Sequence, residues 1–421
     1  MSDPAPAGSD PLRGLAARFL PDGVSRRSLL APVWSSVAIQ LASALSGIAL
    51  ARGLGADARG LLAAVTLWPL TVTMLLEFGV SEYLTVETAR RGLRRGAGLV
   101  RSAQRLAFLA TPVAGVVAIL LLWSQDRVSP APFVITGFAF VYPLLNLRTL
   151  AYAGALNGAG HHSSFQAIRV LVPVSNAVAM VALFAAGLLT VPHALVVMVL
   201  GNWLALRIAR LGFRRRIEDD GDRASLRTLL RGGVGFQASS VFANLVMRVD
   251  QLVVAAVLGD AALGLYVVAV TISSPISTLA ASLAALVLPD VARGGDRRRR
   301  FLSYQAMVLV VGGVGATVLA FSVDVVVPLL FGTDFTGSVP ASRYLAFAGV
   351  PLASMLVTVA ALKAAGDVRG AIAGQALASA CAAVGLAVVL GRSGILGAAQ
   401  VSLLSYVVGA TFLWARAVRS L

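Results

Sequence analysis

The sequence predicts an all-α integral membrane protein, with about twelve transmembrane helices in two parallel six-helix bundles related by pseudo-twofold symmetry. Three observations carry this prediction. Hydrophobic residues make up 58% of the 421 residues, and charged residues make up 13%, about half the roughly 25% of a soluble domain. Apolar runs of about 20 residues, the length that crosses a bilayer as a helix, recur along the chain. Finally, short patterns from the first half recur in the second half.

The apolar runs divide into twelve candidate spans. Several contain Pro, Gly or Ser, which membrane helices tolerate because neighbouring helices satisfy the freed backbone groups. The residues before Pro32 are basic but hold no long apolar run, so they do not form a secretory signal peptide, and we expect a cytoplasmic amino terminus. In chain order, the spans lie near 31–51, 61–81, 105–124, 132–153, 166–187, 190–210, 234–258, 262–288, 302–323, 342–362, 370–391 and 394–415.

The distribution of basic residues supports this topology. The formal net charge is +16, and with both termini inside most of the 35 Lys and Arg residues fall in cytoplasmic segments. This is the positive-inside pattern of a cytoplasmic membrane, where such residues also meet anionic lipids. The basic runs lack interleaved aromatic residues, so a nucleic-acid partner is not expected. Only four arginines fall in segments on the opposite side: Arg52, Arg59, Arg127 and Arg392.

An internal duplication divides the chain into halves. Leu54-Gly55, four residues and Gly60-Leu61 recur as Leu258-Gly259, four residues and Gly264-Leu265, and Ala155-Leu156-x-x-Ala159-Gly160 recurs as Ala361-Leu362-x-x-Ala365-Gly366. Six spans per half is an even number, so both halves insert with the same orientation, as in many carriers. We therefore predict a cytoplasmic segment, two bundles and a cytoplasmic linker with an amphipathic helix, in the order 1–28 (segment), 29–216 (bundle), 217–232 (linker) and 233–418 (bundle).

Glycine-rich and apolar stretches recur along the chain, among them ARGLGADARGLLAAV at 51–65, EFGVSEYLTVETAR at 77–90, RVDQLVVAAVLGDAALGLYVVAV at 248–270, LLFGTDF at 329–335 and ALKAAGDVRGAIAGQ at 361–375. In these stretches the chain, from about residue 29 to residue 418, resembles the polysaccharide transporter family, the O-antigen and capsule repeat-unit flippases of the multidrug/oligosaccharidyl-lipid/polysaccharide superfamily. The resemblance implies two bundles around a central cavity, alternating access and a polyprenyl-diphosphate-linked oligosaccharide as cargo. It also implies a bacterial cytoplasmic membrane, and glycosyltransferases or polymerases as partner proteins.

Charged side chains within the spans are the candidate site, because a charge at mid-membrane costs about 2.5–3.5 kcal/mol and needs a reason. An Arg fork matches the phosphate oxygens of the implied cargo, so Arg248 is the first candidate, with Arg52 beside it. Asp250 and Glu77 would limit how tightly the cargo binds, or titrate with a coupling H⁺ or Na⁺. Two residues apart on a helix, Arg248 and Asp250 point about 200° apart and cannot pair well with each other. The structural alternative is that each belongs to a buried salt bridge that holds helices together. The remaining candidates are Arg148 and Arg169, for which snorkelling is the alternative, and Gln40, for which it is an interhelical contact.

Other activities are disfavoured by the motifs. The Gly-x4-Gly repeats lack the Lys-Ser/Thr of a P-loop, and His161 and His162 have no Cys, Asp or Glu at ligand spacing, so we expect no cofactor, no metal and no enzyme. Two alternatives remain. The first is a multidrug/cation antiporter of the same superfamily, against which the excess of intramembrane Arg over acidic residues counts. The second is a polytopic polysaccharide polymerase or ligase, which would need a larger extracytoplasmic loop with reactive residues.

Overall fold

The computed structural model describes residues 26–215, 225–292 and 296–420, and within these ranges every regular element is helical. The helices are long because the apolar runs that form them are long, and they end mainly at glycine, proline or polar turns. They are α2 (Arg26–Leu76), α3 (Val80–Trp123), α4 (Pro132–Gly158), α5 (His162–Ala185), α6 (Val191–Arg214), α7 (Leu226–Val246), α8 (Val249–Val257), α9 (Asp260–Ala292), α10 (Arg297–Phe331), the 3₁₀ turn η1 (Thr333–Ser338), α11 (Val339–Ala364) and α12 (Val368–Ser420).

The described helices account for the predicted spans. Within the described ranges, nine helices are long and apolar enough to cross a membrane, and α7 with α8 makes a tenth, bent span. Both α2 and α12 are interrupted by one glycine in a non-helical conformation, Gly55 (φ 75°, ψ 179°) and Gly394 (φ 54°, ψ −144°). Each of these glycines turns the chain between two apolar segments. Counting α2 and α12 as two spans each brings the described chain to the twelve that the sequence predicts.

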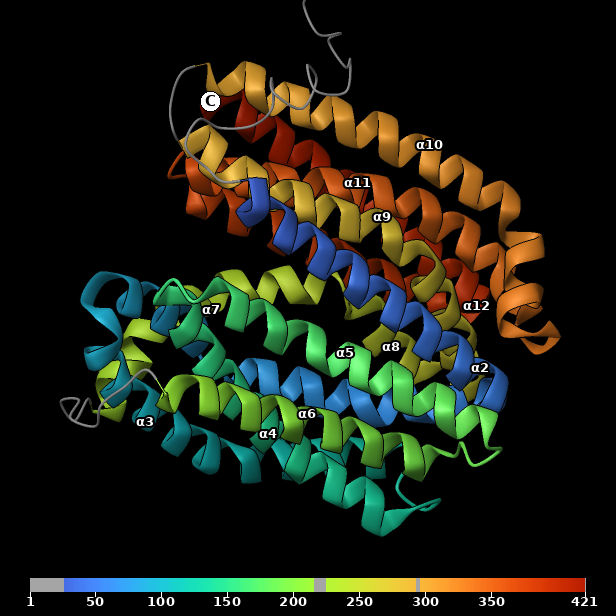
Figure 1. The fold of residues 1–421 in the computed structure, drawn as a ribbon. Coiled ribbons are helices and arrows are strands. Elements are labelled where there is room, and N and C mark those ends of the chain that lie inside the picture. The colour runs from blue at the N-terminus through green and yellow to red at the C-terminus, as the bar shows by residue number, and fades with distance from the viewer. Residues whose placement is uncertain (1–25, 216–224, 293–295, 421) are drawn as a thin grey trace, which may run out of the picture.

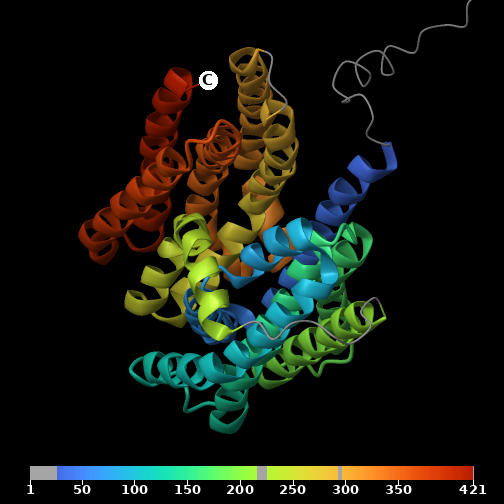
Figure 2. The same ribbon diagram turned by 90° about the vertical axis from the view of Figure 1, so that its left-hand side faces the viewer.

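The helices form two lobes, which we call the N lobe (α2–α6, residues 26–214) and the C lobe (α7–α12, residues 226–420). Figure 2, a view along the helices, separates the two groups, and Figure 1 shows the amino-terminal half of α2 running between α5 of the N lobe and α9 of the C lobe. We call the side where α2 begins and α12 ends, at the left of Figure 1, the basic end, and the opposite side the far end. This arrangement confirms the predicted fold class.

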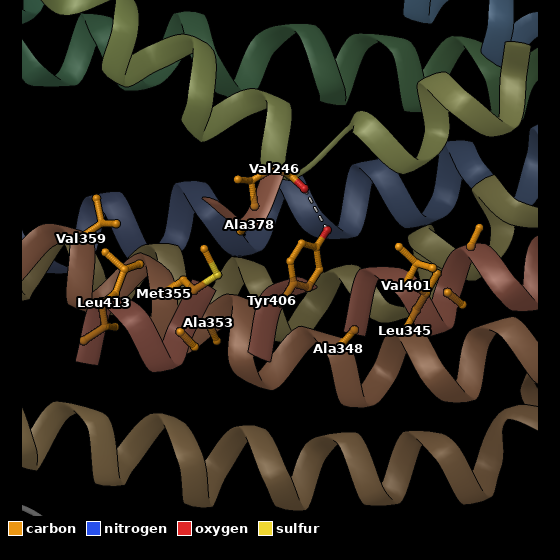
Figure 3. Packing of buried hydrophobic residues seen from close by; sticks show 14 of the residues in the cluster. Val246, Leu345, Ala348, Ala353, Met355, Val359, Ala378, Val401, Tyr406 and Leu413 are labelled. Atoms are coloured by element: carbon orange, nitrogen blue, oxygen red, sulfur yellow. Dashed lines mark hydrogen bonds between the residues drawn. The ribbon is translucent and has the colours of Figure 1, made fainter. Parts of the chain in front are cut away.

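Small residues build the lobe cores, because Ala, Gly and Ser let apolar helices approach closely in a membrane. In the C lobe, alanines and valines of α11 and α12 surround Tyr406, whose hydroxyl donates to the Val246 carbonyl at 3.0 Å (Figure 3). That carbonyl lies at the end of α7, where the helix breaks and leaves it without a helical partner. The outer face of α10, by contrast, exposes large apolar side chains such as Val314, Phe321 and Leu329, as a lipid-facing helix should.

Two predicted spans are broken within the membrane. The span near 61–81 is interrupted at Phe78 (φ 52°) and Gly79 (φ 64°), between α2 and α3, and the span near 234–258 bends by 59° between α7 and α8. Each break lies beside a charged candidate residue, Glu77 at the first and Arg248 at the second. From the sequence, both spans are predicted to be continuous helices that carry a charged residue. The charged residues lie at the breaks, and the prediction that the helices are continuous is wrong.

The predicted domain boundaries remain predictions. Residues 1–25 and 216–224, which hold most of the predicted amino-terminal segment and half of the linker, lie outside the described residues. From Leu226 onward the chain is already α7, which runs on without a break to Val246. The basic stretch expected to form a separate amphipathic helix therefore includes the first turns of a spanning helix.

Candidate functional site

A cavity of about 970 Å³ lies between the lobes, in the half of the molecule nearer the basic end. Its wall includes Asn157 at the end of α4, Phe165 at the start of α5, and Lys363 beside the α11–α12 turn, all of which lie at the basic end. The volume is at the upper end of the roughly 300–1,000 Å³ of small-molecule sites. A cavity of this size accommodates a polar group much larger than an inorganic ion.

The N lobe supplies most of the wall, through one face each of α4 and α5. On α4, the polar lining residues Tyr142, Asn146, Thr149 and Asn157 recur at helical spacing along one face. On α5 the lining residues run from Phe165 to Pro173. This polar face within a predicted membrane helix is a signal in the sequence that charge-based reasoning missed.

Three charged side chains line the cavity. They are Arg169 on α5, Lys363 on α11 and Glu82 on α3. Glu82 accepts a hydrogen bond from Ser240 of α7 at 2.7 Å, which joins the lobes. Arg169 contacts the Gln166 side-chain oxygen at 3.4 Å and lies over the Phe165 ring at 5.7 Å. Within the described part of the chain, neither Arg169 nor Lys363 forms an ion pair, so both remain available to an anion.

The turn that follows Lys363 is fixed by an ion pair and a backbone hydrogen bond. Asp367 accepts two hydrogen bonds from Arg416, at 2.7 and 3.4 Å, and one from the Gly370 backbone amide at 3.0 Å. These bonds, with that of Arg416 first, lower the pKa of Asp367, so its carboxylate is charged at neutral pH. The turn at the end of α11 is therefore tied to α12.

The duplication relates two lining residues. Asn157 and Lys363 occupy the same position in the repeated Ala-Leu-x-x-Ala-Gly pattern, and both line the cavity, one from each lobe. By the positive-inside rule Lys363 is one of the many basic residues expected in cytoplasmic segments, and Asn157 carries no charge that would single it out. The repeat, which places both residues at equivalent helix ends, together with the lone lysine among 35 basic residues, could have identified the pair.

Arg248 lies at the α7–α8 break, as the N-cap residue of α8. It interacts electrostatically with Tyr142 of the N lobe and with Asp250. Tyr142 is the lining residue of α4 furthest from the basic end. Arg248 itself is not among the residues of the cavity wall. In the described chain its guanidinium forms no hydrogen bond or ion pair.

Asp250 is buried inside the C lobe, away from the cavity wall. It accepts hydrogen bonds from Tyr266 of α9 at 2.7 Å and Ser402 of α12 at 3.1 Å, and from the Gln251 backbone amide at 2.7 Å. The expectation that Arg248 and Asp250 point apart, two residues along one helix, agrees with this geometry. The predicted alternative, a salt bridge from either residue to another helix, is not present among the described residues.

Glu77 and Arg148 are not among the residues of the cavity wall, although Ser81, which bonds Glu77, is. Glu77 accepts from the Ser81 amide at 3.4 Å across the α2–α3 break and borders a separate pocket of about 10 Å³, with room for about one water molecule. Arg148 donates to the Gln104 side chain at 2.6 Å and lies 5.0 Å from the centre of the exposed Phe108 ring. Arg148 is on the face of α4 that carries no cavity residue.

Arg52 and Gln40 connect the lobes instead of lining the cavity. Arg52 donates to the carbonyls of Leu329 and Leu330 at the far end of α10 and is not among the residues of the cavity wall, so its assistance to Arg248 remains a prediction. Gln40 of α2 donates to Ser274 of α9 at 2.6 Å and accepts from Thr278 at 2.8 Å. A second bridge between the lobes is formed by Gln237 of α7, which donates to the Met74 and Leu75 carbonyls of α2 at 3.0 and 3.1 Å. The first span of each lobe thus binds the second span of the other lobe through a glutamine.

The comparisons with known proteins agree with this architecture. Residues 27–293 match the family model described as "Polysaccharide biosynthesis protein". The fold is similar to that of the lipid II flippase MurJ in an inward closed conformation, with a TM-score of 0.74, 10% identity, and 91% of this chain and 87% of that chain covered. It is also similar to an inward-facing multidrug resistance MATE family transporter of the MOP superfamily, with a TM-score of 0.67, 16% identity, and coverage of 92% and 97%. No curated protein matches the sequence closely enough to count as a relative.

Proposed function

The chain belongs to the polysaccharide biosynthesis protein family, and from that premise we propose that it is a flippase for a polyprenyl-diphosphate-linked oligosaccharide. It has the fold of MOP superfamily transporters. The observation that carries the proposal is the pair of unpaired cations, Arg169 and Lys363, facing one cavity from opposite lobes. The diphosphate is the feature of the cargo that they would recognise.

The chemistry of the wall suits such a cargo. A guanidinium offers a planar fork of donors and an ammonium a compact charge, and both bind phosphate oxygens strongly where water is scarce. The amides of Asn146, Asn157 and Asn202 can hydrogen-bond sugar hydroxyls, and the rings of Phe165 and Phe236 offer apolar surfaces to pyranose faces. Arg248, beyond Tyr142, would meet the phosphates as they move deeper.

The positive-inside rule gives the proposed direction. The basic end would face the cytoplasm, so that the cavity is open inward and the cargo enters from the inner leaflet of the cytoplasmic membrane. Movement of the lobes about the contacts that Gln40 and Gln237 make between them would then expose the cavity on the opposite side. H⁺ or Na⁺ is the proposed coupling ion, and glycosyltransferases and polymerases that make and use the cargo are the proposed partner proteins.

Multidrug/cation antiport is the second candidate, because the fold is nearly as similar to the MATE transporter, with a TM-score of 0.67, as to MurJ, with a TM-score of 0.74. The charges in the cavity favour the flippase. Two cations against one carboxylate, which is already bonded to Ser240, attract an anion and repel a cationic drug. We propose no catalytic activity for the chain.

The test is complementation of a strain from which this gene has been deleted, with surface polysaccharide as the readout. We expect Arg169→Ala and Lys363→Ala each to reduce surface polysaccharide about tenfold, since losing one phosphate contact of about 1.5–3 kcal/mol costs at least that factor, and Arg248→Ala to abolish it. Arg148→Gln is the matched control, because it removes an intramembrane arginine that does not reach the cavity. Normal polysaccharide in the Arg169→Ala, Lys363→Ala double variant, at wild-type membrane levels, would refute the phosphate role.

A further inference from the structure

The far end of the molecule carries few basic residues, and the structure uses two of them to join the lobes. Under the positive-inside rule, arginines on that side need a reason to be there. Arg127, in the connection between α3 and α4, and Arg52, at the end of the first half of α2, both belong to the N lobe. Each one reaches a group of the C lobe.

Arg127 forms an ion pair with Asp260, the first residue of α9. The distance between Nε and Oδ1 is 2.6 Å, and the Arg127 side chain is only 4% exposed. Gln125 Oε1 accepts a second bond from the same guanidinium. Because Arg127 is buried, removal of Asp260 would leave a charge without an acidic partner in a poorly hydrated place, which strongly favours separation of the lobes.

Arg52 forms the second contact. Its guanidinium donates to the carbonyls of Leu329 and Leu330, with Nε 2.9 Å from the Leu330 oxygen. These carbonyls lie in the last turn of α10, where no later residue of the helix can satisfy them. A cation there also interacts favourably with the helix dipole. The contact exists only while α2 and α10 remain together.

The duplicated glycines form the third contact. Gly60 and Gly264 occupy the same position in the repeated Leu-Gly-x4-Gly-Leu pattern, and they meet across the lobe boundary. A Cβ at Gly60 would lie 1.7 Å from the Asp260 carbonyl oxygen, and a Cβ at Gly264 would lie 2.0 Å from the Ala56 oxygen. The backbones therefore touch, and neither water nor cargo can pass between them.

We propose that these contacts form a latch, made of the Arg127–Asp260 pair, the Arg52–α10 contact and the Gly60–Gly264 contact, which holds the far end shut while the cavity is open at the basic end. The latch must open when the lobes exchange accessibility. The free energy of the latch contacts then sets the relative populations of the conformation open at the basic end and the conformation open at the far end. The proposal depends on the movement of two lobes and not on the identity of the cargo, so it can fail or stand independently of the flippase assignment.

The experiment measures the distance between two spin labels at the far end by pulsed electron paramagnetic resonance. The labels are attached at Asp57→Cys in the N lobe and Asp334→Cys in the C lobe, in a Cys381→Ser background; both label positions are exposed. We expect Asp260→Asn to raise the ratio of the long-distance to the short-distance population by about tenfold or more, since a tenfold shift needs only about 1.4 kcal/mol. We expect Gly60→Leu to act in the same direction.

Asp324→Asn is the matched control, because it breaks the Asp324–Arg343 ion pair, which lies within the C lobe on α10 and α11. The charge-swapped Arg127→Asp, Asp260→Arg variant keeps an ion pair and should restore most of the short-distance population. If Asp260→Asn gives the same distance distribution as the wild type and Asp324→Asn, the latch is refuted. It is refuted equally if the swapped variant is as open as Asp260→Asn.

Discussion

At the scale of single residues, whether an intramembrane arginine reaches the cavity depends both on its depth in the membrane and on the side of the helix from which it projects. Arg148 and Arg169 lie at similar depths by sequence, yet Arg169 lines the cavity whereas Arg148 packs against Gln104 and a lipid-facing ring. The position of a charged residue within an apolar run predicts its depth in the membrane. The direction of its side chain depends on how the helix is rotated against its neighbours. The sequence therefore proposes both arginines, and only the packing of α3 to α6 separates them.

Asp250 is the residue whose predicted role changes most. With three hydrogen bonds and burial inside the C lobe, it joins α8 to α9 and α12. Asp250→Ala would leave the buried hydroxyls of Tyr266 and Ser402 without their acceptor, at about 1–3 kcal/mol for each. We expect the variant to be less stable by about 2–6 kcal/mol, seen as a lower thermal unfolding midpoint in detergent.

The control for this prediction is Asp324→Ala, which removes an exposed carboxylate whose ion pair contributes at most about 1 kcal/mol. An unfolding midpoint for Asp250→Ala equal to that of Asp324→Ala would mean that the Tyr266 and Ser402 contacts do not support the C lobe.

At the scale of elements, the broken helices are the feature that periodicity could not predict. Gly79 separates α2 from α3 in a left-handed conformation, and a Cβ there would lie 2.4 Å from the Gly233 carbonyl oxygen of α7. The same break frees the Met74 and Leu75 carbonyls, which Gln237 satisfies from the other lobe. Apart from Glu77, the composition stays apolar through residue 80, and the close approach of Gly233 explains why the chain turns at Gly79.

We expect Gly79→Ala to destabilise the protein by about 1–2 kcal/mol from the left-handed backbone alone, and further because α7 must move away. The measurement is again thermal unfolding in detergent. Gly313→Ala in α10 is the control, since a Cβ there meets nothing within 4 Å and alanine favours a helix by up to about 1 kcal/mol. Equal stability of Gly79→Ala and Gly313→Ala would show that the contact between α3 and α7 is not tight.

At the scale of the whole molecule, the duplication is the most informative feature of the sequence. It predicts two lobes with the same orientation in the membrane, and in the structure equivalent residues of the two repeats lie at the same places between the lobes. Gly60 faces Gly264 at the far end, and Asn157 and Lys363 line the cavity at the basic end. The twelve spans and the superfamily likewise follow from apolar runs and glycine patterns. The cavity does not, because its wall combines side chains from both lobes whose relative placement is a property of the packed molecule.

The central claim, that the cavity carries an anionic lipid-linked oligosaccharide between leaflets, is tested most directly in proteoliposomes. The measurement is the rate at which a fluorescent polyprenyl-diphosphate oligosaccharide, loaded in one leaflet, becomes accessible to a quencher on the other side. We predict that the wild-type protein moves this lipid, that the Arg169→Ala, Lys363→Ala double variant moves it at least about tenfold more slowly, and that an analogue without phosphates is not moved. Equal rates for the wild type and the double variant, or for the charged lipid and the uncharged analogue, would contradict the claim.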